Sequence, residues 1–419
     1  MTMIMKKKNV LISGGIANIF EWYDYALFGH LASVISTKFF PHLDKSSALL
    51  ETFFLFAVGY LMRPIGGVVF GSIGDKIGRK YALSASIICM SFPTMIMGII
   101  PTYESIGIWS TIIMGIARMI QGFSMGGALT GSVSFIIEHT EKSKRGLMGS
   151  IPMFGICVGI LFGSIVCNSI KAILSEEAFL DYGWRIPFIF GIFIMYVGFY
   201  IKKYTEETPV FEDIKKNHEI EKSPILEVLK NHKMQILISV LINSTGSVIF
   251  YLQAIYITSY LVEQKQFDQI YASYIINSCY VVMAVVTLLS GYLSDVIGRK
   301  KIFILLLLTI LLTNFYVLDL IQENNNILTI FLGLNFFGIL AAFYIGPEPA
   351  MQAEFYDSKI MNTALAISYN LATAIFGGTT PYILSLLMMK YNDIRSFSYY
   401  ISFCCVLSLI GILLYRNNE

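Results

Sequence analysis

Apolar residues occur along the chain in long runs, and short charged segments separate these runs. Twelve runs approach or exceed the length of about 20 residues that an α-helix needs to cross the hydrocarbon core of a bilayer. They cover residues 10–36, 49–71, 81–101, 107–138, 147–171 and 185–203, then 234–262, 270–293, 301–320, 326–346, 360–388 and 395–415. The pattern predicts an all-α membrane protein with twelve transmembrane helices.

A polar stretch divides the twelve runs into two sets of six. Residues Tyr204–Lys233 are rich in Lys, Glu and Asp and contain Pro209 and Pro224. We therefore expect an N-terminal six-helix bundle at 1–203, a cytoplasmic linker at 204–233 and a C-terminal six-helix bundle at 234–419. Within the linker, Ser223–Lys230 predicts a short amphipathic helix on the membrane surface, with one apolar side formed by Ile225, Leu226, Val228 and Leu229.

One charged turn occurs twice. Gly71-Ser-Ile-Gly-Asp75-Lys-Ile-Gly-Arg79-Lys80 returns 220 residues later as Gly291-Tyr-Leu-Ser-Asp295-Val-Ile-Gly-Arg299-Lys300. Each copy lies between two apolar runs. A repeat of about half the chain length predicts two similar, pseudo-symmetric halves, as in many transporter folds.

The composition supports a membrane protein. Apolar residues make up 55% of the chain and charged residues 14%, with a mean hydropathy of +0.66, whereas soluble domains carry about a quarter charged residues. If the N-terminus is cytoplasmic, 21 of the 30 Lys and Arg residues fall on the cytoplasmic side and seven on the outer side. The positive-inside rule then predicts that both termini are cytoplasmic.

Signals for enzymes, metal sites and nucleic-acid binding are missing from the sequence. It has no Gly-xxxx-Gly-Lys-Ser/Thr phosphate loop, no His-Glu-xx-His and no Gly-x-Ser-x-Gly, so we expect no enzyme, no ATP-driven transport and no cofactor. The net charge of +2 gives no reason to expect a nucleic-acid partner. The basic segment Met1–Val10 and the long run after it predict a retained first helix rather than a cleaved signal peptide. Six cysteines lie inside apolar runs at no metal-ligand spacing and are expected to pack there: Cys89, Cys157, Cys167, Cys279, Cys404 and Cys405.

Ionisable side chains inside a membrane span are expensive and therefore mark functional sites. Glu21 and Asp24 share one face of the first span, with Asn18 and Tyr25 close by. Repulsion between two carboxylates in a medium of low dielectric constant favours a proton on one of them, which makes the pair a candidate proton carrier. The alternative is a structural role in which arginines neutralise both acids.

Two arginines also fall inside spans. Arg63 precedes Pro64 in span two, and Arg118 precedes Gln121 in span four. The planar guanidinium group can hold a solute carboxylate through two hydrogen bonds. The alternative is a permanent ion pair with Asp24 or Glu21.

Small residues recur at helical spacing in spans four and five, and interruptions occur in spans ten and eleven. The spacing predicts close helix packing that still permits sliding, at Gly122, Gly126, Gly127 and Gly131 and at Gly155, Gly159 and Gly163. The interruptions, Pro347-Glu348-Pro349 and Gly377-Gly378 with Pro381, either bend gates or end helices.

These residues resemble the major facilitator superfamily and, more narrowly, its metabolite–proton symporter family, which includes proline/betaine, dicarboxylate and citrate carriers. Besides the two turns, the resemblance is carried by Asn18-xx-Glu21-Trp-Tyr-Asp24, Arg63-Pro-Ile-Gly, Arg118-xx-Gln121-Gly-Phe-Ser-x-Gly126-Gly127, Lys144-Arg145-Gly146, Gly183-Trp184-Arg185-Ile-Pro187-Phe, Glu207-Thr-Pro209-Val-Phe211 and Tyr369-Asn370-xxxxx-Phe376-Gly377-Gly378-Thr-x-Pro381.

The resemblance implies alternating access by rocking of two bundles about a central cavity. It implies that Asp75 latches onto the start of span eleven, and that Arg79 pairs with Glu138 at the end of span four. Asp295 and Arg299, in the second turn, are expected to act as gating residues as well. Tyr369 and Asn370 join Asn18, Tyr25, Arg63, Arg118 and Gln121 as candidate solute-binding residues.

The chain departs from the family pattern in places. Ala128 stands where family members usually carry a glutamate, which leaves Glu21 and Asp24 as the candidate proton-coupling residues. Near span eleven the family has Phe-Pro and two arginines, whereas here Phe355–Met361 keeps one basic residue, Lys359. The last predicted span reaches residue 415, close to Glu419, so we expect no cytoplasmic coiled coil like that of some osmosensing relatives.

We therefore expect a proton-coupled symporter in a bacterial inner membrane, working as a monomer on a small zwitterion such as proline or glycine betaine. The two acids and two arginines form a charge-neutral set, which suits a net-neutral solute. One alternative is a di- or tricarboxylate–proton symporter, which needs further unpaired cations. Another is a membrane sensor that does not transport, on a degenerate transporter fold.

Overall fold

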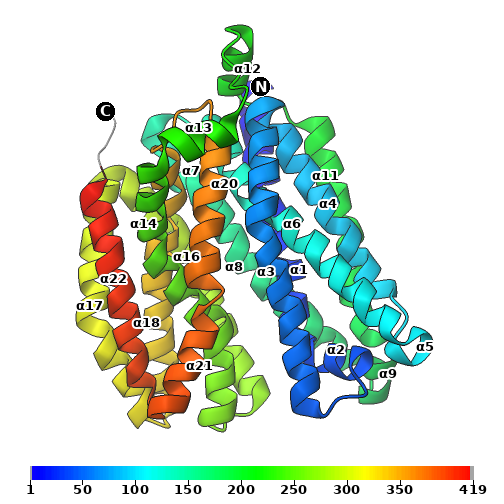
Figure 1. Ribbon diagram of the computed structural model, residues 1–419. Coiled ribbons are helices and arrows are strands. Elements are labelled where there is room, and N and C mark those ends of the chain that lie inside the picture. The colour runs from blue at the N-terminus through cyan, green and yellow to red at the C-terminus, as the bar shows by residue number, and fades with distance from the viewer. Residues whose placement is uncertain (1, 416–419) are drawn as a thin grey trace. The chain divides into compact units, whose positions relative to one another are not determined.

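The chain folds into helices. The computed structural model describes residues 2–415, apart from the side chains of residues 2–13 and of positions 45, 46, 49, 50, 53, 263, 269 and 270, and these described residues contain no β-strand (Figure 1). Eleven helical segments among the described residues are long and apolar enough to cross a membrane. They correspond to predicted spans two to twelve, and the first predicted span falls in α1. The basic side chains near the N-terminus, and Arg416, lie outside the described residues.

The helices group into two compact units. Unit 1 comprises Met1–His139, Gly155–Leu226 and Ser358–Ile367, and unit 2 comprises Thr140–Phe154, Glu227–Asp357 and Ser368–Glu419. Each unit therefore includes a short segment from the other half of the sequence. The predicted domain limits at 203 and 234 stay a prediction.

Unit 1 is built from the first six spans and the helices between them. Its elements are α1 (Thr2–His30), α2 (Ala32–Phe39), α3 (Lys45–Lys76), α4 (Arg79–Ile99), α5 (Tyr103–Ile106), α6 (Ile108–Glu138), most of α8 (Ile151–Ile173), α9 (Glu176–Asp181), η2 (Gly183–Arg185), α10 (Ile186–Ile189), α11 (Gly191–Tyr204), α12 (Pro209–Lys216) and the start of α20 (Met361–Ala372).

Unit 2 is built from the last six spans. Its elements are η1 (Lys142–Lys144), α7 (Arg145–Gly149), α14 (Lys233–Tyr251), η3 (Leu252–Tyr256), α15 (Ile257–Ser259), η4 (Tyr260–Gln264), α16 (Gln269–Ile297), α17 (Arg299–Glu323), α18 (Ile327–Ile345), α19 (Glu348–Ala353), the end of α20, η5 (Thr373–Gly377), α21 (Thr380–Tyr391), η6 (Ile394–Ser396) and α22 (Phe397–Leu414).

Two spans of unit 2 are interrupted by wider helical turns. Span seven contains the π-helical turns η3 and η4, and span eleven contains the π-helical turn η5, next to Gly378. Span ten ends at Ile345, and α19 begins after Pro347. The predicted interruptions of spans ten and eleven are confirmed, whereas the π turns in span seven were not foreseen.

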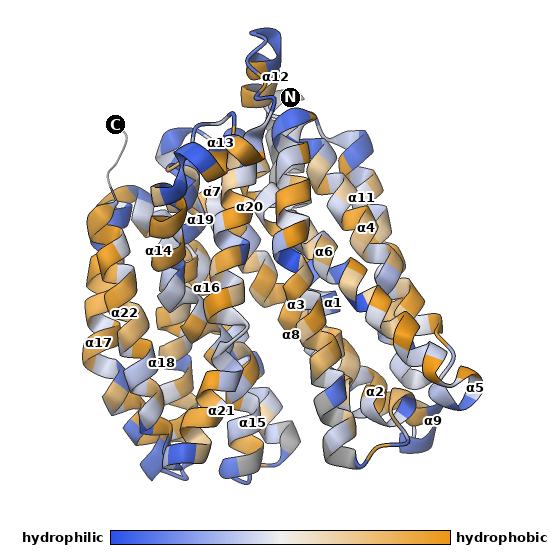
Figure 2. Ribbon diagram, in the orientation of Figure 1, coloured by the Kyte–Doolittle hydropathy of each residue, from blue (hydrophilic) through white to orange (hydrophobic). Residues whose placement is uncertain are grey.

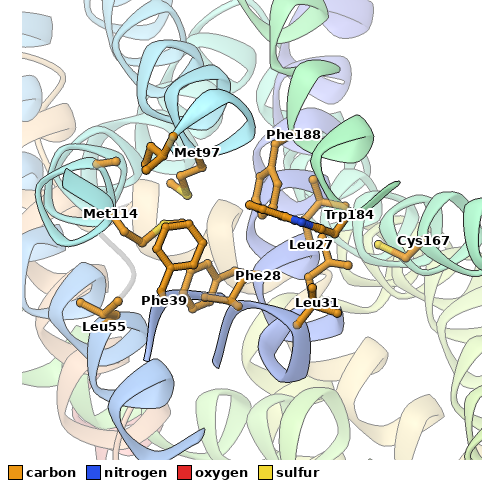
Figure 3. Packing of buried hydrophobic residues seen from close by; sticks show 14 of the residues in the cluster. Leu27, Phe28, Leu31, Phe39, Leu55, Met97, Met114, Cys167, Trp184 and Phe188 are labelled. Carbon is orange, nitrogen blue, oxygen red and sulfur yellow. The ribbon is translucent and has the colours of Figure 1, made fainter. Parts of the chain in front are cut away.

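Apolar residues predominate along the long helices (Figure 2), and they include both buried residues and exposed ones on the outer faces. In unit 1, Phe28, Phe39, Met97 and Met114 converge from four helices, and Trp184 packs beside them (Figure 3). The ring of Trp184 lies 5.9 Å from that of Phe39, edge to face. This cluster packs against α1 and α6, which carry several of the charged residues described in the next section.

The repeated turn has a glycine with a positive φ in both units. Gly78 has a φ of 141° and Gly298 a φ of 96°, and each is the residue before a long helix, α4 or α17. L-residues rarely adopt these angles, which explains the glycine in both copies.

The linker contains the expected helix and a second helix that was not predicted. The expected amphipathic helix is α13 (Pro224–Asn231), and its four apolar residues, at positions i, i+1, i+3 and i+4, lie on one side. Val228 is buried, whereas Leu226 and Leu229 are 54% and 45% exposed. Burial of Val228 within the protein orients the helix, so Leu226 and Leu229 point outward. The helix α12 was not predicted.

Candidate functional site

Glycines bring α3 and α6 into direct backbone contact (Figure 1). A Cβ added at Gly122 would lie 1.9 Å from the carbonyl oxygen of Gly59, and one at Gly126 would lie 2.1 Å from that of Arg63. Only glycine fits such approaches. The contact sets Arg63 of α3 and Arg118 of α6 on neighbouring helices.

A second glycine seam joins α8 to α1. A Cβ at Gly155 would lie 2.7 Å from the carbonyl oxygen of Gly15, and one at Gly159 would lie 2.3 Å from that of Ile19. The predicted close packing at these glycines is confirmed. Gly131 differs, because the nearest atoms to its added Cβ lie 3.8 Å away on Leu83, an ordinary contact.

Asp24, Gln121 and Arg118 form a buried hydrogen-bonded chain across α1 and α6. The Gln121 amide donates to Asp24 Oδ2, and Arg118 Nη1 donates to Gln121 Oε1. All three side chains are at most 2% exposed. The guanidinium carbon of Arg118 also lies 4.1 Å from the centre of the Phe28 ring, at cation–π distance. Arg118 thus reaches Asp24 through Gln121 rather than by the direct ion pair considered from the sequence.

Glu21 differs from Asp24 in its hydrogen bonding. It is 1% exposed, and neither carboxylate oxygen has a hydrogen-bond partner among the described residues. The charges of Arg63 and Asp24 act on it. The Arg63 guanidinium lies over the Tyr60 ring at 5.4 Å.

A small pocket opens between α1, α3 and α6, wholly within unit 1. It holds about 200 Å³ of space that protein atoms do not fill, part of it open to the outside. Four of the predicted solute-binding side chains line it, namely Tyr25, Arg63, Arg118 and Gln121. The full lining is Tyr25, Phe56, Gly59, Tyr60, Arg63, Arg118, Gln121, Gly122 and Met125.

The other predicted residues lie elsewhere. Asn18 does not line this pocket, because its amide donates to Gly14 O at 2.7 Å and to Ser132 Oγ at 2.8 Å. Tyr369 and Asn370 belong to unit 2, next to η5, and Asn370 is buried. Ala128 is buried in α6 and offers no carboxyl group.

The first copy of the repeated turn is a buried network in unit 1. Asp75 accepts hydrogen bonds from the backbone N–H groups of Asn362, at 3.2 Å, and Thr363, at 2.8 Å, where α20 begins. Arg79 lies 3.3 Å from Asp75 and 3.0 Å from Glu138. These are the contacts that the resemblance implied, and their role in gating stays a prediction.

The second copy makes matching contacts in unit 2. Asp295 accepts hydrogen bonds from the backbone N–H groups of Gly146, at 2.7 Å, and Leu147, at 2.9 Å, at the start of α7. Arg299 lies 3.5 Å from Asp295 and 3.0 Å from Glu354. Arg299 therefore bridges two carboxylates, as Arg79 does.

Sequence reasoning missed Glu354 as the partner of Arg299, and it missed the backbone N–H groups at the start of α7 that donate to Asp295. Glu138 and Glu354 are 216 residues apart, as are Gly146 and Asn362, so an internal alignment with an offset near that of the repeat would have found them.

It also missed Glu207 and Thr208. Glu207 accepts from the backbone N–H of Lys80 at 3.1 Å, and the Thr208 hydroxyl donates to Glu138. The motif Glu207-Thr-Pro209 was noticed in the sequence, but its target was not evident because it lies 127 residues away.

Comparison with known families divides the chain at the linker. The family model "Sugar (and other) transporter" matches residues 10–233, and the family model "Major Facilitator Superfamily" matches residues 236–419.

Curated relatives match over nearly the whole chain. The "Putative proline/betaine transporter" of Staphylococcus aureus (strain MSSA476) is 32% identical over 97% of this chain and 87% of its own length. The "Glycine betaine/proline/ectoine/pipecolic acid transporter OusA" of Dickeya dadantii is 31% identical, covering 97% of this chain and 82% of that protein. The "Proline/betaine transporter" of Salmonella typhimurium is also 31% identical, with the same coverage.

Solved structures show the same fold at lower identity. The proton:xylose symporter XylE, bound to 6-bromo-6-deoxy-D-glucose, matches with a TM-score of 0.78 and 18% identity, covering 98% of this chain and 95% of that one. The human organic anion transporter MFSD10 matches with a TM-score of 0.72 and 13% identity, covering 98% and 99%. These likenesses confirm the predicted fold class, a membrane protein of twelve helices.

Proposed function

Because the chain belongs to the major facilitator superfamily of membrane transporters, we propose that it is a proton-coupled symporter of a zwitterionic osmolyte such as proline or glycine betaine. The observation that carries the proposal is the buried set of Glu21, Asp24, Arg63 and Arg118 within unit 1. Curated relatives named for proline and betaine point to the same solutes.

The charge balance of this set favours a neutral solute. Two acids and two arginines cancel, and a buried net charge is costly unless it is compensated. A zwitterion brings one charge of each sign and leaves the balance unchanged. A di- or tricarboxylate needs further cations, and the relatives' names do not favour this alternative or the non-transporting sensor.

We assign different roles to the two acids. Glu21 has no hydrogen-bond partner among the described residues and is the proposed proton carrier, because its proton can leave without breaking a bond to the protein. Asp24 is tied to Gln121 and keeps Arg118 in place. Arg63 and Arg118 line the pocket and supply the donors for a solute carboxylate.

We further propose that the protein lies in the bacterial inner membrane as a monomer with both termini cytoplasmic. The excess of Lys and Arg on the side of the N-terminus supports this orientation. In this orientation the repeated turns lie at the cytoplasmic ends of their helices, and we propose that their networks act as gates on that side.

Uptake of labelled solutes into proteoliposomes tests the proposal. We expect uptake of proline or glycine betaine that an inward proton gradient accelerates, and little uptake of succinate or citrate. Preference for the carboxylates would support the alternative substrate class, and no uptake of any solute would support the sensor. Glu21→Gln should abolish the effect of the gradient, with Glu104→Gln, at the exposed α5, as a matched control.

A further inference from the structure

A carboxyl group that the proposed mechanism does not use lies inside unit 2. Glu348, the first residue of α19, is 4% exposed. Its Oε1 accepts one hydrogen bond, at 3.1 Å, from the neutral side-chain amide of Gln352. Gly246 of α14 faces it, since a Cβ there would lie 3.4 Å from Glu348 Oε2 and 2.6 Å from the Tyr344 ring. Glycine at this position brings the α14 backbone up to the carboxyl group.

The surroundings of Glu348 differ from those of every other buried carboxyl group in the described chain. Five acidic residues are buried there: Glu21, Asp24, Asp75, Glu138 and Glu348. An arginine acts on each of the first four: Arg63 on Glu21, Arg118 on Asp24, and Arg79 on both Asp75 and Glu138. Among the described residues, no cation acts on Glu348.

The two arginines near α19 interact with Glu354 and not with Glu348. Arg299 of α17 and Arg145 of α7 act on Glu354, at the end of the same short helix. The titratable group beside Glu348 is Tyr344 of α18, whose hydroxyl donates to the carbonyl oxygen of Ile242 of α14. The phenol keeps its proton as the donor of this hydrogen bond, so Tyr344 brings no charge to Glu348.

An ionised carboxylate without a cation is strongly unfavourable in a medium of low dielectric constant, and such a group takes up a proton instead. We propose that Glu348 is a second proton-binding site, which holds a proton in the buried state described here and releases it when water reaches unit 2. The exchange is a single acid–base step between the carboxylic acid and the carboxylate, with water as the acceptor. Gln352 can donate its hydrogen bond to either form.

The inference deepens the proposed proton coupling and rests on it for its place in the transport cycle. It adds a proton site in unit 2 to the one at Glu21 in unit 1. Protonation of Glu348 does not depend on the proposed transport function, and it can be measured without a transport assay.

Infrared difference spectroscopy of the reconstituted full-length protein, titrated from acidic to alkaline pH, tests the proposal. Wild type should show a carbonyl band of a carboxylic acid that Glu348→Gln lacks and that fades as the pH rises. Glu354→Gln is the matched control. Glu354 lies at the other end of the same short helix but faces arginines from α17 and α7, so its substitution should leave this band in place. If Glu348→Gln does not fold, Glu348→Asp should shift the band instead of removing it.

Two spectroscopic results would overturn the proposal. One is a spectrum in which Glu348→Gln retains every carboxylic-acid band of wild type, or, where this variant does not fold, one in which Glu348→Asp shifts none of them. The other is a Glu348 band of constant intensity at every pH, which would mean a permanent structural proton.

Transport by the same variant separates this inference from the proposed function. Glu348→Gln should lose accumulation, so that the inside-to-outside ratio of labelled glycine betaine falls to one, while exchange between equilibrated vesicles persists. Full gradient-driven accumulation by this variant would overturn the coupling role of Glu348. If wild type itself ignores the gradient, the proposed function fails, and the infrared titration still decides whether Glu348 exchanges its proton.

Discussion

Asp75 and Asp295 make the same contact in the two units, each accepting two backbone N–H groups at the start of a helix. The donors are the second and third residues of that helix in both cases, Asn362 and Thr363 in α20 and Gly146 and Leu147 in α7. A carboxylate at this position satisfies N–H groups that the helix cannot pair internally and interacts favourably with the helix dipole. The repeated turn is therefore a repeated structural contact.

Asp75→Asn tests whether this contact contributes to transport. Asparagine keeps the size of the side chain but loses the charge, and a hydrogen bond to a charged group contributes about 1.5–3 kcal/mol. Because about 1.4 kcal/mol corresponds to a factor of ten, we expect uptake to fall roughly tenfold or more while the protein stays folded in the membrane. Initial rates of uptake, with the amount of protein in the membrane as control, provide the measurement. Unchanged uptake would count against the latch.

Glu138→Gln and Glu354→Gln should weaken the two units to different degrees. Removing one partner of a buried ion pair costs about 3–5 kcal/mol, whereas an exposed pair contributes about 0–1 kcal/mol. The Glu138 side chain is 2% exposed and that of Glu354 is 25% exposed. Thermal unfolding in detergent should therefore show the larger loss for Glu138→Gln. A larger loss of unfolding temperature for Glu354→Gln would mean that burial does not determine how much these ion pairs stabilise the protein.

Gly122→Ala and Gly131→Ala form a matched pair in α6. The added methyl group at Gly122 meets a backbone carbonyl at 1.9 Å, whereas at Gly131 it meets side-chain and backbone atoms at 3.8 Å or more. Overpacking costs about 1–3 kcal/mol or more, so Gly122→Ala should lower the unfolding temperature and displace Arg118. Gly131→Ala should be neutral or stabilising by up to about 1 kcal/mol, since alanine favours the helix. Equal effects of the two substitutions would refute the tight α3–α6 seam.

His139 predicts a pH dependence of stability in unit 1. Burial lowers the pKa of His139 below its usual 6.5, although Phe135 O, 2.8 Å from Nδ1, and Glu207 oppose this shift. The folded protein thus binds this proton more weakly than the unfolded chain does. The contribution of His139 to stability is complete above pH 6.5 and is lost as the pH falls through the lowered value. Unfolding temperatures measured across this range should fall less steeply for His139→Gln than for wild type.

Hydropathy and the repeat were sufficient to predict the fold, because membrane spans and duplicated turns are local patterns. The first-span acids and the arginines were found for the same reason, since any charge in an apolar run stands out. The hydrogen-bond partners of these buried residues could not be assigned from the sequence. Gln121 is polar but neutral, so nothing in the sequence marks it as the link between Asp24 and Arg118, and the contact of Asn18 with Ser132 spans 114 residues.

Glu348 illustrates a different limit. In the sequence it lies between two prolines at the end of a span, which suggested a helix break rather than a buried acid. Whether a carboxyl group has an arginine beside it depends on tertiary contacts. Only the structure distinguishes Glu348 from Glu354, which follows six residues later at the C-cap of the same helix.

Proton movement upon solute addition tests the central claim most directly. Proteoliposomes that contain a pH-sensitive dye and no imposed gradient are mixed with glycine betaine or proline, and the internal pH is followed over time. We predict acidification of the interior by wild type, abolished by Glu21→Gln and absent in protein-free vesicles. Entry of labelled solute without any change of internal pH would contradict proton-coupled symport.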